Sequence, residues 1–167
     1  MKLIHTFNEE QFSKNEINKM GVRRAIRAVI FDDENNIAIL HVQRDKYYSL
    51  PGGAVEKDET FQSGFVRECW EETGCRVEIV KEVGETFEIR GQNNMINNSV
   101  CYIAKIIGEK GPLNLDEDEL DENIKLIWVD IDKAIELTSN YSNKVSLYNK
   151  YTRQRDIIFL KEVKSNL

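Results

Sequence analysis

The sequence predicts an α/β domain in which helices cover both faces of a mixed β-sheet. Short apolar runs rich in β-branched residues recur along the chain, as is typical of strands. A charged helical pattern follows the turn at residues 51–53, and a longer helical pattern covers about residues 145–163. Helices and a sheet stabilise each other by burying an apolar face against a neighbouring layer, which favours an α/β/α sandwich.

The length and charge of the chain limit the classes of protein it can belong to. The chain has 167 residues, and we expect residues 1–167 to form a single domain with its own core. The formal net charge of −6 argues against a nonspecific nucleic-acid-binding protein, which usually carries a basic face. No stretch approaches the length of a membrane span, and the first residues lack the apolar core of a signal peptide. We therefore expect no membrane association and no stable nucleic-acid partner, and formation of a homodimer stays open.

The cysteines point to a reducing environment. Cys69, Cys75 and Cys101 are odd in number and widely spaced, so they do not form a disulfide framework. Two of them lie in or beside the charged helical segment. The expected location is the cytoplasm.

The strands are predicted from apolar runs between turn-forming residues. Residues 25–31 and 37–42 flank the sequence Asp-Asp-Glu-Asn-Asn, which is typical of a turn, so these two runs are predicted to pair as a hairpin. Residues 1–20 are expected to be a short strand or extended lead-in followed by a polar stretch. Later elements are predicted as strands at 77–90, 99–107 and 125–129, a polar loop at 91–98, a turn at 108–112, an acidic segment at 116–122 and a short helix at 131–137.

The most informative segment is the helix that follows residues 51–53. Thr60 is well suited to be its N-cap, because a threonine hydroxyl can accept a hydrogen bond from a free amide of the first turn. Gly74 ends the helix at a position where a left-handed residue is wanted. The predicted helix therefore covers about thirteen residues of mixed apolar and acidic character.

Three carboxylates share one face of this helix. Glu68, Glu71 and Glu72 recur at offsets of three and four, so they lie within a stripe about 100° wide. Like charges at this spacing repel one another unless a cation lies against them. Hard divalent cations prefer oxygen ligands, which makes Mg²⁺ or Mn²⁺ the natural occupant. The alternative is an acidic helix face that is simply exposed to solvent.

The segment resembles the signature of the Nudix hydrolases. That signature is Gly, five residues, Glu, seven residues, Arg-Glu, an apolar residue, any residue, Glu-Glu, any residue, Gly and an apolar residue. The resemblance implies a Nudix-type α/β/α sandwich with a mixed β-sheet and a metal-binding helix after a glycine-rich turn. The matching positions are Gly53, Glu59, Arg67, Glu68, Cys69, Glu71, Glu72, Gly74 and Cys75.

The resemblance also implies a chemistry. Members of the family cleave a phosphoanhydride bond of a nucleoside diphosphate linked to another moiety. By this resemblance Glu68, Glu71 and Glu72 are catalytic and hold Mg²⁺ or Mn²⁺, and the carbonyl of Gly53 adds an oxygen ligand. Glu59 and Arg67 match the pair that braces the loop against the helix in this family, and a salt bridge between them is expected.

The base that activates water is less well defined. One of the helix carboxylates, or an acid from the segment at 116–122, would orient or deprotonate the attacking water. In relatives a glutamate from this loop reaches the metal site, which makes Glu119 and Glu122 candidates. The alternative is an ordinary charged loop.

Substrate-binding residues are expected near the first strands and the turn. Arg44 matches the place of an arginine that contacts phosphates in related proteins, and Arg27 is a second candidate, because guanidinium groups suit phosphate oxygens. Tyr48, together with Tyr47, lies just before the turn, where an aromatic ring could stack on a base. The alternative for each residue is a structural or surface role.

Two residues that are typical of particular Nudix subfamilies are missing from this sequence, and their absence is the only guide to the substrate class. Relatives that hydrolyse ADP-ribose often carry a proline about fifteen residues beyond the signature, whereas no proline follows Cys75 until Pro112. The tyrosine typical of dinucleoside polyphosphate hydrolases is also missing, since the next tyrosine is Tyr102. These absences favour a nucleoside triphosphate, including an oxidised one, in a housecleaning role. The alternatives are a hydrolase of ADP-ribose or another nucleoside diphosphate derivative, and a noncatalytic nucleotide sensor on the same fold.

Overall fold

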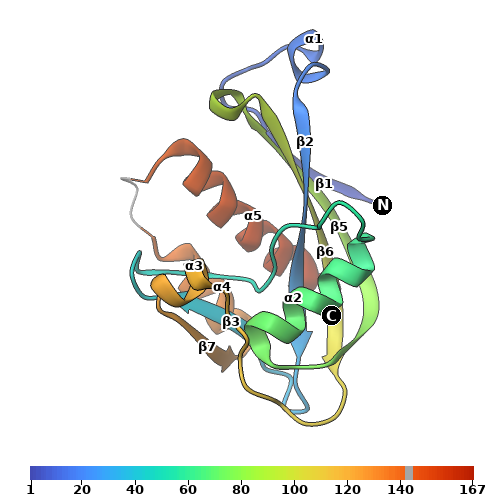
Figure 1. The fold of residues 1–167 in the computed structure, drawn as a ribbon, viewed down its shortest axis with the longest axis vertical. Coiled ribbons are helices and arrows are strands. Elements are labelled where there is room, and N and C mark those ends of the chain that lie inside the picture. Colours follow the sequence, from blue (N-terminus) through green and yellow to red (C-terminus); the bar gives the residue numbers. More distant parts are fainter. Residues whose placement is uncertain (142–144) are drawn as a thin grey trace.

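The computed structural model describes residues 1–141 and 145–167, apart from the side chains of residues 118 and 119. Within this part of the chain, seven strands form one mixed sheet with helices on both faces (Figure 1). The strands are β1 (Leu3–Phe7), β2 (Gly21–Phe31), β3 (Ile37–Val42), β4 (Tyr47–Ser49), β5 (Val77–Arg90), β6 (Met95–Ile106) and β7 (Ile124–Val129). The helices are α1 (Lys14–Ile17), α2 (Phe61–Thr73), the 3₁₀ turn η1 (Gly91–Asn93), α3 (Glu117–Asp121), α4 (Ile131–Ser139) and α5 (Leu147–Lys164). The predicted class, a mixed sheet between helices, is confirmed.

The sheet has the order β1-β5-β6-β2-β3-β4, and β7 pairs with β3. β2 runs parallel to β6 along its whole length, β5 is antiparallel to β6, and β1 is parallel to β5. The long strands β2, β5 and β6 extend beyond the body of the molecule as a narrow arm, with α1 at its far end (Figure 1). The sheet is therefore mixed because β5 and β6 pair as an antiparallel hairpin, whereas β2 pairs in parallel with β6, which lies far along the sequence.

The prediction that β2 and β3 pair as a hairpin is wrong beyond one pair, which joins the last residue of β2 to the first residue of β3. The turn between them forms, since the Asp32 carboxylate accepts the N–H groups of Glu34 and Asn36. However, β2 and β3 meet only at Phe31 and Ile37. Most of residues 25–30 of β2 and most of β3 are buried, and each strand pairs over a greater length with another strand, β2 with β6 and β3 with β7. The strands separate, and the free edge of β2 is left for another segment of the chain.

That segment contains the glycine-rich turn. The N–H of Ile26 donates to the carbonyl of Gly53 at 3.0 Å, and the N–H of Ala28 donates to the carbonyl of Pro51 at 2.9 Å. Farther along, the N–H of Val55 donates to the carbonyl of Arg24 at 3.0 Å. Buried backbone groups must be paired, so the turn takes the place that a neighbouring strand would otherwise fill.

The polar loop predicted at residues 91–98 is shorter than expected. β6 already begins at Met95, and Asn97 and Asn98 are buried within it. Their amides are satisfied across the sheet: Asn97 accepts a hydrogen bond from Arg23 at 2.9 Å, and Asn98 donates to Glu85 at 2.8 Å. Polar residues can therefore continue this strand because side chains on neighbouring strands supply their partners.

Two apolar cores lie on opposite faces of the sheet. On one face Phe65 and Cys69 of α2 pack with alternate residues of β2, including Ile26, and with Tyr102. On the other face Phe159 and Leu160 of α5 pack with a second set that includes Val29. The three cysteines are free and buried in these layers, as small apolar residues would be. Side chains of β2 alternate between the two layers, because successive residues of a strand point to opposite faces.

The ends of α2 are where the sequence predicts them. Thr60 is the N-cap, and its hydroxyl accepts the N–H of Ser63 at 3.0 Å. Gly74 follows the last turn with a φ of 64° and donates its N–H to the carbonyl of Trp70. A Cβ atom on Gly74 would lie 2.2 Å from the carbonyl oxygen of Gly111. Glycine is therefore required here both by conformation and by the neighbouring loop.

We predict that Gly74→Ala destabilises the protein more than Gly108→Ala. Both glycines have positive φ, 64° and 79°, but a Cβ on Gly108 would meet nothing within 4 Å. Gly108→Ala should therefore cost only the left-handed backbone term, about 1–2 kcal/mol, and Gly74→Ala should cost more because Gly111 must also move. Denaturant unfolding of both variants measures the difference, and equal losses would contradict the prediction.

Candidate active site

The guanidinium of Arg67 connects the turn to the acidic face of α2. Its Nε and Nη2 donate to the Glu59 carboxylate at 2.8 and 3.0 Å, which is the contact that the sequence resemblance predicts. Its Nη2 also donates to the carbonyl of Ala54 at 2.9 Å. Its Nη1 donates to Glu68 and to Glu71, each at 2.9 Å. One cation therefore offsets the repulsion among three carboxylates and ties them to the loop.

The hydrogen bonds from Arg67 also control the ionisation of Glu59. They are the largest cause of a pKa that is lowered to about 2, so Glu59 is ionised at neutral pH. The same ion pairs raise the pKa of Arg67. The brace is thus charged on both sides throughout the neutral range.

Glu68 is held in a tight space beside the turn. It is 7% exposed, and burial is the largest influence on its pKa, which is raised despite the opposing effect of Arg67. A Cβ atom on Gly53 would lie only 2.5 to 2.8 Å from the Glu68 carboxylate. The backbone at Gly53 can approach this carboxylate because glycine has no side chain.

Glu72 faces a different part of the turn. It is 5% exposed, and its carboxylate accepts the N–H of Gly52. Glu68 and Glu71, in contrast, line a cavity of about 590 Å³ together with Glu56 and Asp116. Arg23 and Arg67 are the cations on the wall of this cavity, which we name the carboxylate cavity. The structure therefore brings Glu68 and Glu71 together and directs Glu72 toward the backbone of the turn.

The residues around the carboxylate cavity fit a hard divalent cation by type, although the structure does not assemble a finished set of ligands. Among the residues described, no group of three or more His, Cys, Asp or Glu side chains is arranged to hold a metal ion. The donors at the cavity are carboxylate and carbonyl oxygens, the ligands that Mg²⁺ and Mn²⁺ prefer. The carbonyl of Gly53 accepts one hydrogen bond, from Ile26, and a carbonyl oxygen has a second lone pair.

Asp116 and Glu56 were not singled out by the sequence analysis. Asp116 lies in the acidic segment but just before α3, and Glu56 lies between the matched positions Gly53 and Glu59. Their positions inside the predicted site segments were the only available signals. The structure adds both carboxylates to the cavity wall that contains Glu68 and Glu71.

Glu122 is placed elsewhere. Its carboxylate accepts a hydrogen bond from Arg44 at 3.1 Å, and Arg44 also donates to Asp121 at 3.0 Å. Glu122 and Arg44 line a second cavity of about 540 Å³, which we name the tyrosine cavity after Tyr47 on its wall. Glu119, the other candidate in the acidic segment, lies outside the side chains that the structure describes.

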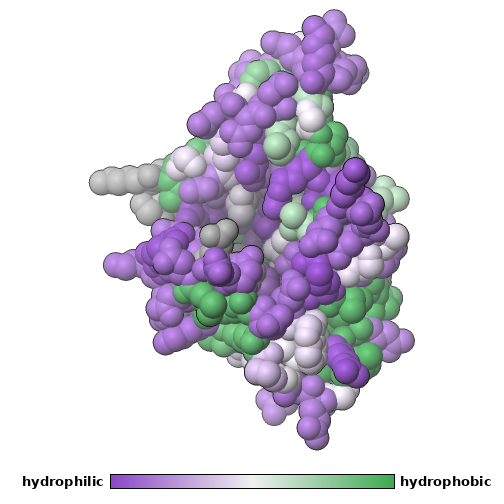
Figure 2. Space-filling model, viewed as in Figure 1, coloured by the Kyte–Doolittle hydropathy of each residue, from purple (hydrophilic) through white to green (hydrophobic). Residues whose placement is uncertain are grey.

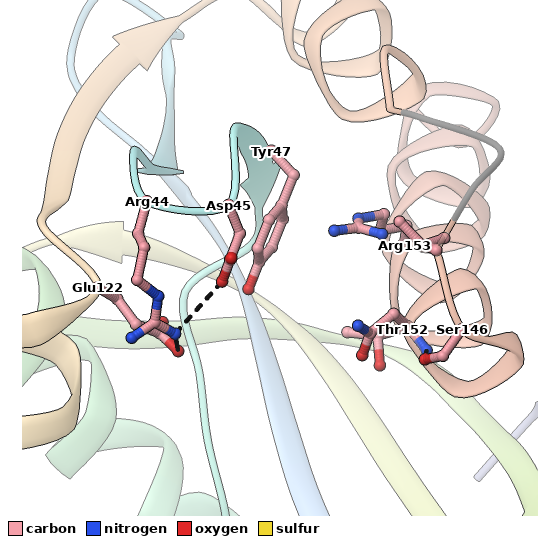
Figure 3. A pocket seen from close by; sticks show the side chains of 9 residues that line it. Arg44, Asp45, Tyr47, Glu122, Ser146, Thr152 and Arg153 are labelled. Carbon is pink, nitrogen blue, oxygen red and sulfur yellow. Dashed lines mark hydrogen bonds and ion pairs between the residues drawn. The ribbon is translucent and has the colours of Figure 1, made fainter.

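Arg153 extends from α5 toward Tyr47, which lies on β4 at the opposite wall of the tyrosine cavity (Figure 3). The guanidinium of Arg153 lies 4.5 Å from the centre of the Tyr47 ring. Arg153 is 5% exposed, and its Nε and Nη1 have no hydrogen-bond partner in the described part of the chain. Arg153 was not predicted from the sequence, because a charged residue in a helical pattern gives no sign that it is buried.

Tyr48 and Arg27, two predicted substrate-binding residues, have mainly protein neighbours. The Tyr48 ring stacks on His41 with centres 4.3 Å apart and packs against the α5 core. Arg27 is 12% exposed and donates to the backbone carbonyls of Ile26 and Gly52. Burial is the largest cause of a pKa lowered to about 10, which leaves Arg27 charged at neutral pH. Their contact with substrate stays a prediction.

This face of the molecule is largely hydrophilic and is hollowed near its centre (Figure 2). No helix among residues 1–141 and 145–167 is long and apolar enough to cross a membrane.

Comparison with known proteins identifies the family. The NUDIX domain family matches residues 21–151, which include strands β2 to β7, the turn and α2. Because this match covers most of the sequence, the chain belongs to the Nudix hydrolase family and is an enzyme of that class. Nudix hydrolases as a family generally use divalent metal ions.

Two curated relatives share part of the sequence. A MutT-like protein of Streptomyces ambofaciens is 35% identical over 60 residues, which are 36% of this chain and 39% of the relative. The match therefore spans well under half of that relative. The putative 8-oxo-dGTP diphosphatase YtkD of Bacillus subtilis is 27% identical over 110 residues, which are 60% of this chain and 69% of the relative.

Solved structures share the fold at low sequence identity. The MutT protein of Methanosarcina mazei Go1 superposes with a TM-score of 0.59 at 17% identity, over 89% of this chain and 97% of the other. The NUDIX domain of Shewanella oneidensis NrtR, solved in complex with ADP ribose, superposes with a TM-score of 0.60 at 10% identity, over 94% of each chain. At this level of identity the similarity establishes the fold alone.

We predict that Gly53→Ala weakens Mn²⁺ binding and turnover without a large loss of stability. The added Cβ would lie 2.5 Å from an oxygen of Glu68, so that carboxylate must move, whereas the backbone of Gly53 needs no positive φ. Disturbing the groups that orient a metal ligand typically lowers metal affinity or activity by about 10–100-fold. Titration with Mn²⁺ and thermal unfolding test this.

Gly21→Ala is the matched control, since its Cβ would meet only the Asn94 carbonyl at 3.9 Å. Gly21→Ala should leave both measurements near the wild-type values. Wild-type Mn²⁺ affinity in Gly53→Ala would contradict the prediction.

Proposed function

We propose that this protein is a metal-dependent pyrophosphohydrolase that cleaves a phosphoanhydride bond of a nucleoside triphosphate, including oxidised ones, in a housecleaning role. The observation that carries this proposal is the carboxylate cavity, in which Glu68 and Glu71 are held by Arg67 beside the glycine turn. The name of the Bacillus subtilis relative, a putative 8-oxo-dGTP diphosphatase, supports the triphosphate. The ADP ribose bound to the NrtR domain supports the alternative of a nucleoside diphosphate derivative.

Glu68, Glu71 and Glu72, with the Gly53 carbonyl, would hold Mg²⁺ or Mn²⁺, and Asp116 adds a further carboxylate on the cavity wall. A bound divalent cation would neutralise phosphoryl oxygens and help to orient the phosphate chain. Arg67 would then keep Glu59 and the loop fixed while the carboxylates rearrange around the cation. In metal sites, residues that do not touch the metal commonly hydrogen-bond to the ligands and orient them.

The chain's own residues would perform the remaining steps. Arg23 faces the carboxylate cavity and is held by Asn97 at 2.9 Å, so its free guanidinium N–H groups are positioned to bind phosphoryl oxygens. Glu71 or Glu72 would orient the attacking water and accept its proton. Water would attack one phosphorus of the anhydride directly, and no covalent enzyme intermediate would form.

The tyrosine cavity would take the nucleoside. Its volume of about 540 Å³ falls within the range of small-ligand sites, about 300–1,000 Å³. Tyr47 offers an aromatic ring and Arg153 offers unpaired buried N–H groups that suit the acceptor atoms of a base. Arg44, on the same wall as Glu122, would contact a phosphate or ribose oxygen.

The proposal is tested by release of phosphate and pyrophosphate from a panel of nucleotides. The panel holds canonical and 8-oxo nucleoside triphosphates, ADP-ribose, nucleoside diphosphate sugars and dinucleoside polyphosphates, each with Mg²⁺, Mn²⁺ or EDTA. We expect turnover of triphosphates that EDTA abolishes. Preferred turnover of ADP-ribose would favour the alternative substrate class, and nucleotide-dependent thermal shift without any turnover would favour a sensor.

We predict that Glu71→Gln and Glu72→Gln each lower kcat by at least about 100-fold while the protein stays folded, because an amide cannot replace a carboxylate as metal ligand or base. Glu78→Gln is the matched control, since Glu78 is an exposed glutamate on β5. Steady-state kinetics and circular dichroism measure the effects. Near-normal turnover in both helix variants would refute the assignment.

We also predict that Asp116 matters more for kcat than Glu122 does. Asp116 lines the carboxylate cavity, whereas Glu122 pairs with Arg44 at the tyrosine cavity. Asp116→Asn should therefore lower kcat at saturating substrate, and Glu122→Gln should mainly raise KM. A larger fall in kcat for Glu122→Gln would instead support Glu122 as the base.

A further inference from the structure

Helix α5 carries charged side chains into the interior of the protein. Arg155 and Asp156 are each 1% exposed, and both lie within the layer that packs on the sheet face opposite α2. Burying an ion costs several kcal/mol, and a buried ion pair often contributes no more stability than apolar residues of similar volume. The contacts of Asp156 indicate what this charge does for the protein.

Asp156 connects α5 to the start of the glycine-rich turn. Its Oδ2 accepts the N–H of Leu50 at 3.1 Å, and its Oδ1 accepts the Nε–H of Arg155 at 2.9 Å. The same Oδ1 lies 3.7 Å from Nε of Arg27. The Asp156 carboxylate therefore holds the backbone just before the turn and also faces the guanidinium of Arg27.

Arg27 continues this connection into the turn. Its Nη1 donates to the carbonyl of Gly52 and, at 2.7 Å, to the carbonyl of Ile26. Its Nε has no hydrogen-bond partner in the described chain, so its attraction to Asp156 is electrostatic. The guanidinium thus lies between the Asp156 carboxylate on α5 and the backbone oxygen of Gly52.

Gly52 completes the path to α2. Its φ is 129°, and a Cβ there would lie 2.4 Å from the carbonyl oxygen of Ile26, so its backbone has little freedom. Its N–H donates to the carboxylate of Glu72. The peptide groups on both sides of Gly52 are therefore held by side chains, one by Arg27 of β2 and the other by Glu72 of α2.

We propose that Asp156 and Arg27 are a positioning pair, which holds residues 50–52 so that the N–H of Gly52 orients the Glu72 carboxylate. In this role both residues act through the backbone of the turn and not on the reacting atoms. Arg27 acts on the carbonyl of Gly52, and Asp156 acts on the N–H of Leu50 and on the orientation of Arg27. The catalytic consequence rests on the proposed function, whereas the effect on the backbone of the turn does not.

Glu88, another buried charge that pairs with Arg155, can serve as a control for Asp156. Glu88 is 0% exposed and pairs with Arg155 at 3.2 Å and with Arg90, but it has no contact with residues 50–53 among those the structure gives. Glu88→Gln removes the same charge from the same buried network, one side chain farther from the turn. It should lower the melting temperature as Asp156→Asn does, without releasing the turn.

The test compares Asp156→Asn, Arg27→Lys and Glu88→Gln with the wild-type protein. Hydrogen exchange of the backbone amides of Leu50, Gly52 and Gly53 reports on the turn, since Pro51 has no N–H, and Mn²⁺ titration, kcat and KM report on the site. In Asp156→Asn and Arg27→Lys we expect faster exchange at residues 50–53. We also expect Mn²⁺ affinity or kcat to fall about 10–100-fold, which is the usual effect of losing a residue that orients a metal ligand. KM should be nearly unchanged.

Several outcomes would overturn the proposal. Wild-type exchange at residues 50–53 in folded Asp156→Asn would do so, as would kinetic losses in Glu88→Gln as large as those in Asp156→Asn. If Asp156→Asn does not fold, Arg27→Lys decides, because it keeps both buried charges and the bond from Leu50; wild-type exchange and kcat in that variant would refute the pair. Failure of the wild-type protein to show metal-dependent turnover would refute the proposed function, while the exchange measurement would still test the turn.

Discussion

The site depends on the separation of β2 from β3. Because the two strands part after Phe31 and Ile37, the edge of β2 is free to accept the turn as a substitute neighbour. Backbone hydrogen bonds to Pro51 and Gly53 then fix the turn against the sheet, within reach of α2 on one face and α5 on the other. The carboxylates of Glu68 and Glu72 both lie against this fixed piece of backbone.

Charge is balanced locally although the chain is acidic as a whole. The acidic face of α2 is offset by Arg67, which also reaches Glu59 in the loop. On the other side of the sheet, Arg27 and Arg155 lie against Asp156 and Glu88. In each case an arginine is used, whose planar, permanently charged guanidinium can bridge several oxygens at once. The two clusters meet at Gly52, where the carbonyl faces Arg27 and the N–H faces Glu72.

The local features of the candidate site could be predicted from the sequence, and its long-range contacts could not. The limits of α2 follow from Thr60 and Gly74, because a cap is determined by residues within one turn of the helix end. The pairing of β2 depends on β6, about 70 residues away, and local turn signals cannot report it. Asn97 looks like a loop residue in the sequence, since its partner Arg23 lies on another strand.

The sequence also could not show which charged residues are buried. Arg153, Arg155 and Asp156 occur in a helical pattern in which most charges would be exposed, and only the packing of α5 on the sheet makes them interior. The acidic segment shows the same limit on a smaller scale. Asp116 and Glu122 are six positions apart in one run of acids, yet they face different cavities because α3 lies between them.

The bond between Asp156 and Leu50 joins residues that are 106 positions apart. A protein is synthesised from its N-terminal end, so the turn and α2 leave the ribosome well before α5 exists. During that interval the backbone at Leu50 lacks its carboxylate partner, and Arg27 faces Gly52 without a counter-ion from α5. The strands of the sheet are therefore all synthesised before α5 can supply the contacts that Asp156 makes with Leu50 and Arg27.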